Sequence, residues 1–129
     1  MLRPRHHLAA GFTVIELLVV LAAIALLLSI AAPRYVQYLD AARETVLKQD
    51  LYQMRDALDK FYSDQARYPD SLDELVTKRY LRERPTDPIT ARSDSWVVVP
   101  PPAKIAGLVG DVRSGAKGKS RDGSAYESW

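Results

Sequence analysis

The sequence predicts an α+β fold in which one long N-terminal helix packs against a small antiparallel sheet. The first observation is an apolar run from Phe12 to Pro33, followed by an amphipathic stripe whose apolar positions recur every three or four residues as far as Phe61. The second is a change after Arg67 to short β-branched runs separated by prolines and glycines. The chain has 129 residues and no cysteine, so packing alone must stabilise one small domain.

The composition excludes most classes of enzyme. Both histidines, His6 and His7, lie in the segment Met1–Gly11. Without that segment the chain has neither His nor Cys, which excludes a Ser-His-Asp triad, a cysteine nucleophile and zinc sites built on those ligands. We therefore expect that the protein is not an enzyme and that it has no cofactor.

Residues 1–11 have the composition of a short basic leader. They include Arg3 and Arg5 and no acid, so they carry the whole formal net charge of +2. The remainder of the chain is neutral, which is not typical of a protein that binds nucleic acid or anionic lipid.

Residues 12–33 are long and apolar enough to cross a membrane, because a helix of about 20 apolar residues spans a bilayer. Two simple interpretations are a secretory signal peptide with its cleavage site at Ser29-Ile30-Ala31, and a plain membrane anchor. Glu16, the only charged residue of the segment, counts against both. A carboxylate costs about 2.5–3.5 kcal/mol at the centre of a spanning helix, and no partner for it is nearby in the segment.

The residues around this carboxylate, GFTVIELLVV from Gly11 to Val20, resemble the processing motif of type IV prepilins and of the pseudopilins of type II secretion. The resemblance implies that a membrane-embedded aspartyl peptidase cuts between Gly11 and Phe12 and methylates the new amino group of Phe12. It also implies that the apolar segment remains on the mature protein as a single inner-membrane span. The N-terminus would be cytoplasmic and the C-terminal domain periplasmic, an orientation that the positive charges alone leave open.

Glu16 follows Phe12 by four residues and therefore shares its helix face. Within one chain the carboxylate and the new α-ammonium of Phe12 can pair. In the filament that the resemblance implies, Glu16 reaches the Phe12 ammonium of a neighbouring subunit. Since a buried charge is costly unless it is paired, this contact would favour subunits in the correct register, and Phe12 and Glu16 are the predicted assembly residues.

Residues 34–66 are predicted to continue the helix beyond the membrane. Pro33 removes the N–H that would bond the Ser29 carbonyl, so we expect a kink or local melting there. On the exposed side we expect two i,i+4 ion pairs, between Glu44 and Lys48 and between Asp56 and Lys60. The stripe that faces the core consists of Leu47, Leu51, Met54, Leu58 and Phe61, extended towards the membrane by Val36, Leu39, Ala42 and Val46.

Residues 67–129 are predicted to form a small domain of short elements. Ser71 and Glu74 have the spacing of a capping box, which starts a short helix ending at about Lys78. Runs of β-branched and apolar residues predict strands at Ser95–Val99, Ile105–Arg113 and Ala125–Trp129, and the polar residues 114–123 predict a glycine loop.

This half, with RYPDSLDELV near its start and DVRSGAKGKSRDGSAYESW at its end, resembles the protein G type (major) pseudopilin of type II secretion. One departure is that Asp87-Pro88 continues as ITAR, whereas the family has Trp-Gly-Asn-Pro after its Asp-Pro pair. The other is Lys117, at a place where the calcium-binding loop of the family has an acidic ligand.

The resemblance therefore leaves only weak metal candidates in the loop, namely Asp111, Ser114 and Asp122, and calcium is disfavoured. We expect the Lys117 ammonium to occupy roughly the place of the ion and to pair with Asp122. The alternative is that Lys117 points into solvent.

Together the resemblances imply a structural subunit of a type II secretion pseudopilus, a periplasmic filament that drives export of folded proteins through the outer membrane. The implied partners are other copies of the chain, other pseudopilins, the inner-membrane assembly platform, the prepilin peptidase and methylase, and the inner membrane. An alternative is a type IV pilus subunit acting in adhesion, motility or DNA uptake. Nucleic acid is an unlikely ligand, because no aromatic stacking platform accompanies the four cations Arg113, Lys117, Lys119 and Arg121.

Overall fold

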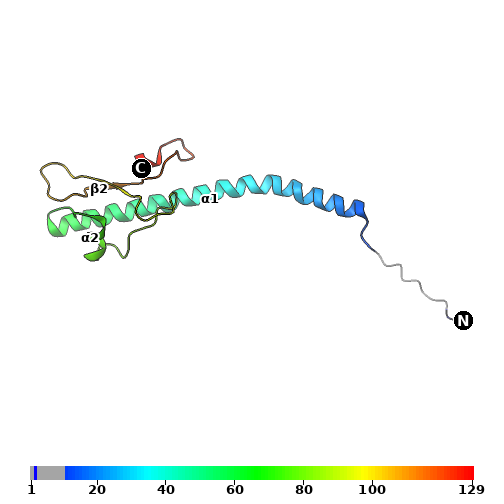
Figure 1. Ribbon diagram of the computed structural model, residues 1–129, viewed down its shortest axis with the longest axis horizontal. Coiled ribbons are helices and arrows are strands. Elements are labelled where there is room, and N and C mark those ends of the chain that lie inside the picture. The colour runs from blue at the N-terminus through cyan, green and yellow to red at the C-terminus, as the bar shows by residue number, and fades with distance from the viewer. Residues whose placement is uncertain (1, 3–10) are drawn as a thin grey trace. The chain divides into compact units, whose positions relative to one another are not determined.

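The computed structural model describes Leu2 and residues 11–129. The other residues of the predicted leader, with Arg3, Arg5 and both histidines, lie outside the described residues. The elements in chain order are helix α1 (Val14–Gln65), helix α2 (Leu72–Thr77), strands β1 (Val97–Val99) and β2 (Asp111–Arg113), and a 3₁₀ turn, η1 (Tyr126–Ser128) (Figure 1). The chain divides into two compact units, Met1–Gln37 and Tyr38–Trp129. The predicted α+β class is confirmed.

Helix α1 agrees closely with the helix predicted over residues 12–33 and 34–66. It continues through Pro33, so the predicted local melting is wrong, whereas the kink stays a prediction. Proline removes one backbone hydrogen bond, and the helix-forming residues on both sides propagate the element past it. The helix ends where Ala66 adopts a left-handed φ of 55°, with its N–H bonded to the Tyr62 carbonyl at 2.9 Å.

The core of the second unit forms on the predicted stripe of α1. All five predicted positions from Leu47 to Phe61 are buried, and Ala57 joins them. The proposed extension is wrong for Val36, Ala42 and Val46, which are exposed. The other core residues come from α2, from β2 and from the segments around the strands: Leu72, Leu75, Trp96, Val109 and Val112.

Within this unit, α2 lies on one side of α1, and the sheet and the C-terminal end lie on the other (Figure 1). The predicted cap of α2 is confirmed, because the Ser71 hydroxyl accepts the Glu74 N–H at 3.3 Å. The Glu74 carboxylate also accepts the Asp70 N–H at 2.7 Å and binds Arg67 at 2.6 Å. These contacts fix the turn that follows α1.

The sheet is smaller than predicted. Strands β1 and β2 pair antiparallel, with Val98 opposite Val112 at the centre of the register. The predicted second strand over Ile105–Arg113 is wrong before Asp111. Both Leu108 and Val109 donate their N–H groups to the Pro69 carbonyl in the chain after α1, at 3.1 and 3.0 Å, and the Gly110 N–H donates to the Val99 carbonyl of β1 at 2.8 Å.

Gly107 allows this close approach. Its φ is +113°, and a Cβ at that position would lie 2.2 Å from the Tyr68 carbonyl oxygen. The Tyr68 N–H in turn donates to the Ala106 carbonyl at 2.9 Å.

The third predicted strand, Ala125–Trp129, is also wrong. Its residues form η1, in which Ser128 bonds back to Ala125 and Trp129 to Tyr126. Ala125 alone makes a bridge, to Lys119. Trp129 nevertheless packs inward, since its ring lies against the core and its indole N–H donates to the Ser124 hydroxyl at 2.8 Å.

Candidate functional site

The predicted cleavage junction lies just before α1, with little packed around it. The Phe12 side chain is 91% exposed. A Cβ added to Gly11 would meet no described atom within 4 Å. Residues 11–129 therefore do not require a glycine at position 11 for steric reasons, so a requirement for glycine can come from a protein that binds the junction.

Thr13 caps the helix that follows. Its hydroxyl accepts the Glu16 N–H at 3.2 Å, and its carbonyl accepts the Leu17 N–H at 3.1 Å. This cap explains why α1 begins at Val14 and leaves Phe12 outside the helix. The capping role of Thr13 is not among the sequence predictions above, although the pattern Thr-x-x-Glu at the start of an apolar run is a signal for it.

Glu16 lies in the first turn of α1 and is exposed. Together with Phe12, Thr13, Leu17 and neighbouring residues it lines a shallow hollow of about 330 Å³. Among the described residues, no side chain pairs with its carboxylate. An unpaired carboxylate near a helix N-terminus, beside an exposed aromatic residue, can accept a cation supplied from outside the chain.

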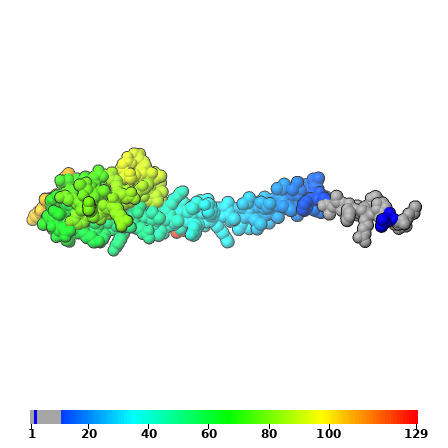
Figure 2. Space-filling view, turned by 90° about the horizontal axis from the view of Figure 1, so that it is seen from below, coloured from blue at the N-terminus to red at the C-terminus, as the bar shows by residue number. Residues whose placement is uncertain are grey.

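The following stretch of α1 has an uncovered apolar surface. Large aliphatic side chains from Val14 to Ile30 are about half or more exposed, and Figure 2 shows this stretch (blue to cyan) on the molecular surface. The most apolar 18-residue window of α1 has a mean hydropathy of 2.9, and none of it is buried. By length and composition α1 can cross a membrane, and the lack of burial argues against a core helix of a soluble domain.

The three weak metal candidates belong to separate contacts. Asp111 accepts from the Arg55 guanidinium at 3.0 Å, and the Ser114 hydroxyl donates to the buried Asp87 carboxylate at 2.6 Å. Asp122 accepts from the hydroxyls of Ser120 and Ser124. The structure thus does not assemble these residues into one ligand set, and in residues 11–129 it shows no cluster of three His, Cys, Asp or Glu side chains suited to a metal.

The predicted pair of Lys117 with Asp122 is wrong. Lys117 is exposed, which agrees with the alternative that it points into solvent, and no ion pair of its ammonium is found among the described residues. Hydrogen bonds from Ser120 and Ser124 lower the pKa of Asp122 instead. These two hydroxyls satisfy the carboxylate locally, so the loop needs no ammonium at that place.

Glu44 is the buried acid that holds the C-terminal loop on α1. Its side chain accepts the Arg121 N–H at 2.9 Å, the Tyr126 hydroxyl at 3.1 Å and the Arg121 guanidinium at 3.3 Å. Burial alone would raise the pKa of Glu44, but these hydrogen bonds hold it below its usual value. The predicted exposed pair of Glu44 with Lys48 is therefore wrong, whereas the pair of Asp56 with Lys60 is confirmed at 2.8 Å.

Two cations of α1 reinforce this docking. Lys48 lies over the Trp129 ring, 4.7 Å from its centroid. Arg55 donates to the carbonyl oxygens of Val112 and Trp129, at 3.0 and 2.7 Å, in addition to its bond with Asp111. Arg55 is not among the residues predicted from the sequence, because its partners come more than fifty residues later in the chain.

Comparison with known proteins gave two relatives. The chain is 34% identical over 72 residues to the type IV major pilin protein PilA of Myxococcus xanthus. It is 32% identical over 95 residues to the type II secretion system core protein G of Pseudomonas aeruginosa. No family model and no solved structure matches the chain.

The two matches differ in how much of each relative they cover. The match to the pilin covers 56% of this chain and 31% of the relative, so the chain spans about a third of that protein. The match to the core protein covers 61% of this chain and 67% of the relative.

Proposed function

The chain belongs to the family of type IV pilins and type II secretion pseudopilins, and on this premise we propose that it is a structural subunit of a type II secretion pseudopilus. In this role it forms a periplasmic filament that drives folded proteins through the outer membrane. It acts as a building block and not as an enzyme, and its only covalent chemistry is done to it by the prepilin peptidase.

One observation carries the proposal. The aliphatic side chains of α1 between Val14 and Ile30 are exposed, and the only charge among them is the unpaired Glu16 of the first turn. Such a surface needs an apolar environment, and its single carboxylate needs a cation. Before assembly, a membrane supplies the apolar environment. After assembly, neighbouring subunits supply the apolar environment through their helices and the cation through the Phe12 ammonium.

The pseudopilus is preferred to a pilus on the extent of the matches. The match to the core protein covers two thirds of that relative, whereas the match to the pilin covers less than one third. In the pseudopilus the leader is cytoplasmic, α1 anchors the subunit in the inner membrane, and Tyr38–Trp129 is periplasmic. The partners are copies of the chain, other pseudopilins and the assembly platform.

The proposal is tested by deleting the gene and measuring two outputs, the secretion of folded proteins into the medium and the presence of surface pili. We expect secretion to fail and the exported proteins to accumulate in the periplasm, with surface pili and motility unchanged. Complementation with the full chain should restore secretion. Loss of pili with normal secretion would overturn the assignment in favour of the type IV pilus.

The processing step is tested on the mature protein by mass spectrometry. We expect an N-terminal Phe12 that carries one methyl group. A chain that begins at Ala32 would instead establish a secretory signal peptide. Because a Cβ at position 11 meets no described atom within 4 Å, Gly11→Ala and Gly11→Glu should leave the fold unchanged, and only a bulky or charged residue should block cleavage.

The second candidate function is a type IV pilus subunit, which the similarity to the major pilin supports. Its DNA-uptake form has weaker support, because one of the four loop cations, Arg121, is bound to Glu44. Binding of DNA that falls steeply with salt would favour that form, and a lack of binding at low salt would exclude it.

A further inference from the structure

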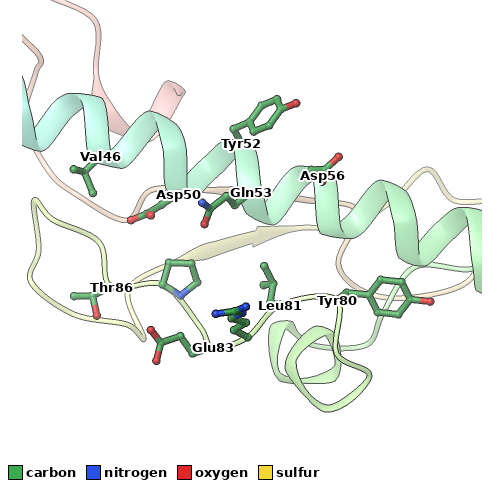
Figure 3. Close-up of a pocket in the computed structure, with 11 residues that line it drawn as sticks. Val46, Asp50, Tyr52, Gln53, Asp56, Tyr80, Leu81, Glu83 and Thr86 are labelled. Carbon is green, nitrogen blue, oxygen red and sulfur yellow. The ribbon is translucent and has the colours of Figure 1, made fainter.

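A groove lies between α1 and the loop that follows α2 (Figure 3). Its volume is about 630 Å³, within the range of roughly 300–1,000 Å³ typical of sites that hold small molecules, so a long side chain can enter it. Val46, Asp50 and Gln53 point into it from α1, and the opposite wall carries Glu83 and Thr86. We call this feature the groove.

The groove has an excess of negative charge. Its lining has three acids and one cation, Arg82. One of the acids, Asp56, is bound to Lys60. Among the described residues, Asp50 and Glu83 have no side-chain hydrogen bond or ion pair, although Asp50 is half-buried. Burial, together with the charge of Asp87, raises the pKa of Asp50, so a cation placed beside this carboxylate would stabilise its charged form.

The same unit carries an uncompensated positive segment. Residues 113–119, which we call the basic segment, include Arg113, Lys117 and Lys119, and all three side chains are exposed. No ion pair of these cations is found within the described part of the chain. The positive charge of the basic segment is therefore complementary to the negative charge of the groove.

These two features are separate patches of the same unit, because neither Arg113, Lys117 nor Lys119 lines the groove. The loop that forms one wall of the groove also contacts the basic segment, since the Ser114 hydroxyl donates to the Asp87 carboxylate at 2.6 Å. A contact between the groove of one copy and the basic segment of the next joins two different patches. They make a heterologous contact, and a heterologous contact that does not close into a ring produces an open filament.

We propose that the groove of each subunit receives the basic segment of a neighbouring copy, whose cations pair with Asp50 and Glu83. The proposal rests on the proposed function, because it assigns a contact within the filament. It differs from the Phe12–Glu16 contact, since it joins the Tyr38–Trp129 units and requires no membrane. The exposed Val46 at the groove edge adds an apolar contact.

The first experiment is site-specific cross-linking in cells that assemble the full chain. The chain has no cysteine, so introduced pairs react in a clean background. Thr86→Cys lies in the groove lining and Lys119→Cys lies in the basic segment. With a short bismaleimide, the double variant should give a ladder of dimers, trimers and higher species, because each subunit has one partner on either side.

The matched control combines Lys119→Cys with Gln49→Cys, an exposed position on α1 outside the groove. We expect no ladder from this pair. Products that stop at the dimer would overturn the heterologous contact, and a ladder from the control pair would overturn the assignment to the groove. A product in which Thr86→Cys is joined to a different protein would overturn the choice of a second copy.

The second experiment exchanges the charges. Asp50→Lys should reduce the ladder about fivefold, as expected from loss of one surface ion pair and gain of a like-charge contact. Lys117→Glu should do the same, and the two reversals combined should restore the yield. Asp50→Asn, which changes only the charge, should give a smaller loss, and Asp70→Lys, an exposed acid outside the groove, should give none.

Electron microscopy of the same cells separates this inference from the proposed function. Filaments that form without the cross-link would overturn the groove contact and leave the proposed function standing. An absence of filaments from the wild-type chain, with its partners present, would overturn both.

Discussion

The Glu44 carboxylate accepts the backbone N–H of Arg121 at 2.9 Å and so joins α1 to a loop 77 residues later in the chain. Glu44→Ala would leave this N–H and the Tyr126 hydroxyl without their acceptor. We expect the free energy of unfolding to fall by about 1–3 kcal/mol. Denaturant unfolding of the full chain in detergent measures it. Asp56→Ala, which removes only the exposed pair with Lys60, should cost about 0.3–0.5 kcal/mol. Equal losses in the two variants would contradict the role given to Glu44.

The same contact predicts a dependence of stability on pH. The folded state holds the pKa of Glu44 below its ordinary value of 4.5. Its contribution is therefore complete above pH 4.5, and it is lost as the pH falls through the lowered folded pKa. Glu44→Gln cannot titrate and should show a smaller loss of thermal stability across this acidic range. An identical acid dependence in both proteins would exclude Glu44 as the titrating group.

Calcium should not stabilise the protein. The candidate ligands Asp111, Ser114 and Asp122 are committed to three separate contacts, and calcium requires six to eight oxygens around one point. We expect the melting temperature to be the same in calcium and in chelator, both for the wild type and for Lys117→Asp. A rise with calcium in either protein would show that the loop can rearrange into a site, because any ligand of the native state stabilises it.

Glu16→Val separates membrane insertion from assembly. Removal of a carboxylate from the apolar stretch should leave insertion at least as efficient. Assembly should nevertheless fall sharply, because the Phe12 ammonium of a neighbour loses its partner. Membrane fractionation measures the first quantity and cross-linked filament yield the second. Normal assembly of Glu16→Val would show that the carboxylate has no role in register.

Ala66→Gly should stabilise the fold. Ala66 has a φ of 55° at the end of α1, a conformation that costs a residue with a Cβ about 1–2 kcal/mol and glycine almost nothing. We expect a net gain of up to about 1 kcal/mol, because glycine also adds entropy to the unfolded chain. Ala57→Gly, in the buried interior of the helix, should destabilise by a similar amount or more. A loss of stability in Ala66→Gly would contradict the assigned strain.

The features that were predictable from the sequence are those set by neighbours along the chain. The bounds of α1, the buried stripe from Leu47 to Phe61 and the Ser71 cap depend on spacings of three and four residues, which the sequence displays directly. The cap at Thr13 has the same kind of signal and was predictable as well.

The errors occur where distant residues compete with local ones. Glu44 has the spacing for a pair with Lys48, but Arg121 and Tyr126 reach it from the C-terminal loop and exclude water from it. Ile105–Gly110 has the composition of a strand, yet the N–H groups of Leu108 and Val109 bond the Pro69 carbonyl in the chain after α1. Arg55 has no signal of its own in the sequence, since its partners are defined only by the tertiary fold.

The uncovered aliphatic surface of α1 has a consequence for the thermodynamics of filament growth. Lipid tails are about as apolar as the leucine side chains of a neighbouring helix, so moving this segment from a bilayer into a bundle of like helices releases little hydrophobic free energy. The segment therefore has nearly the same hydrophobic free energy in the bilayer as in a bundle of like helices. The hydrophobic free energy of this segment therefore favours neither addition of a subunit to the filament nor its return to the bilayer. Small polar contributions decide which of the two occurs.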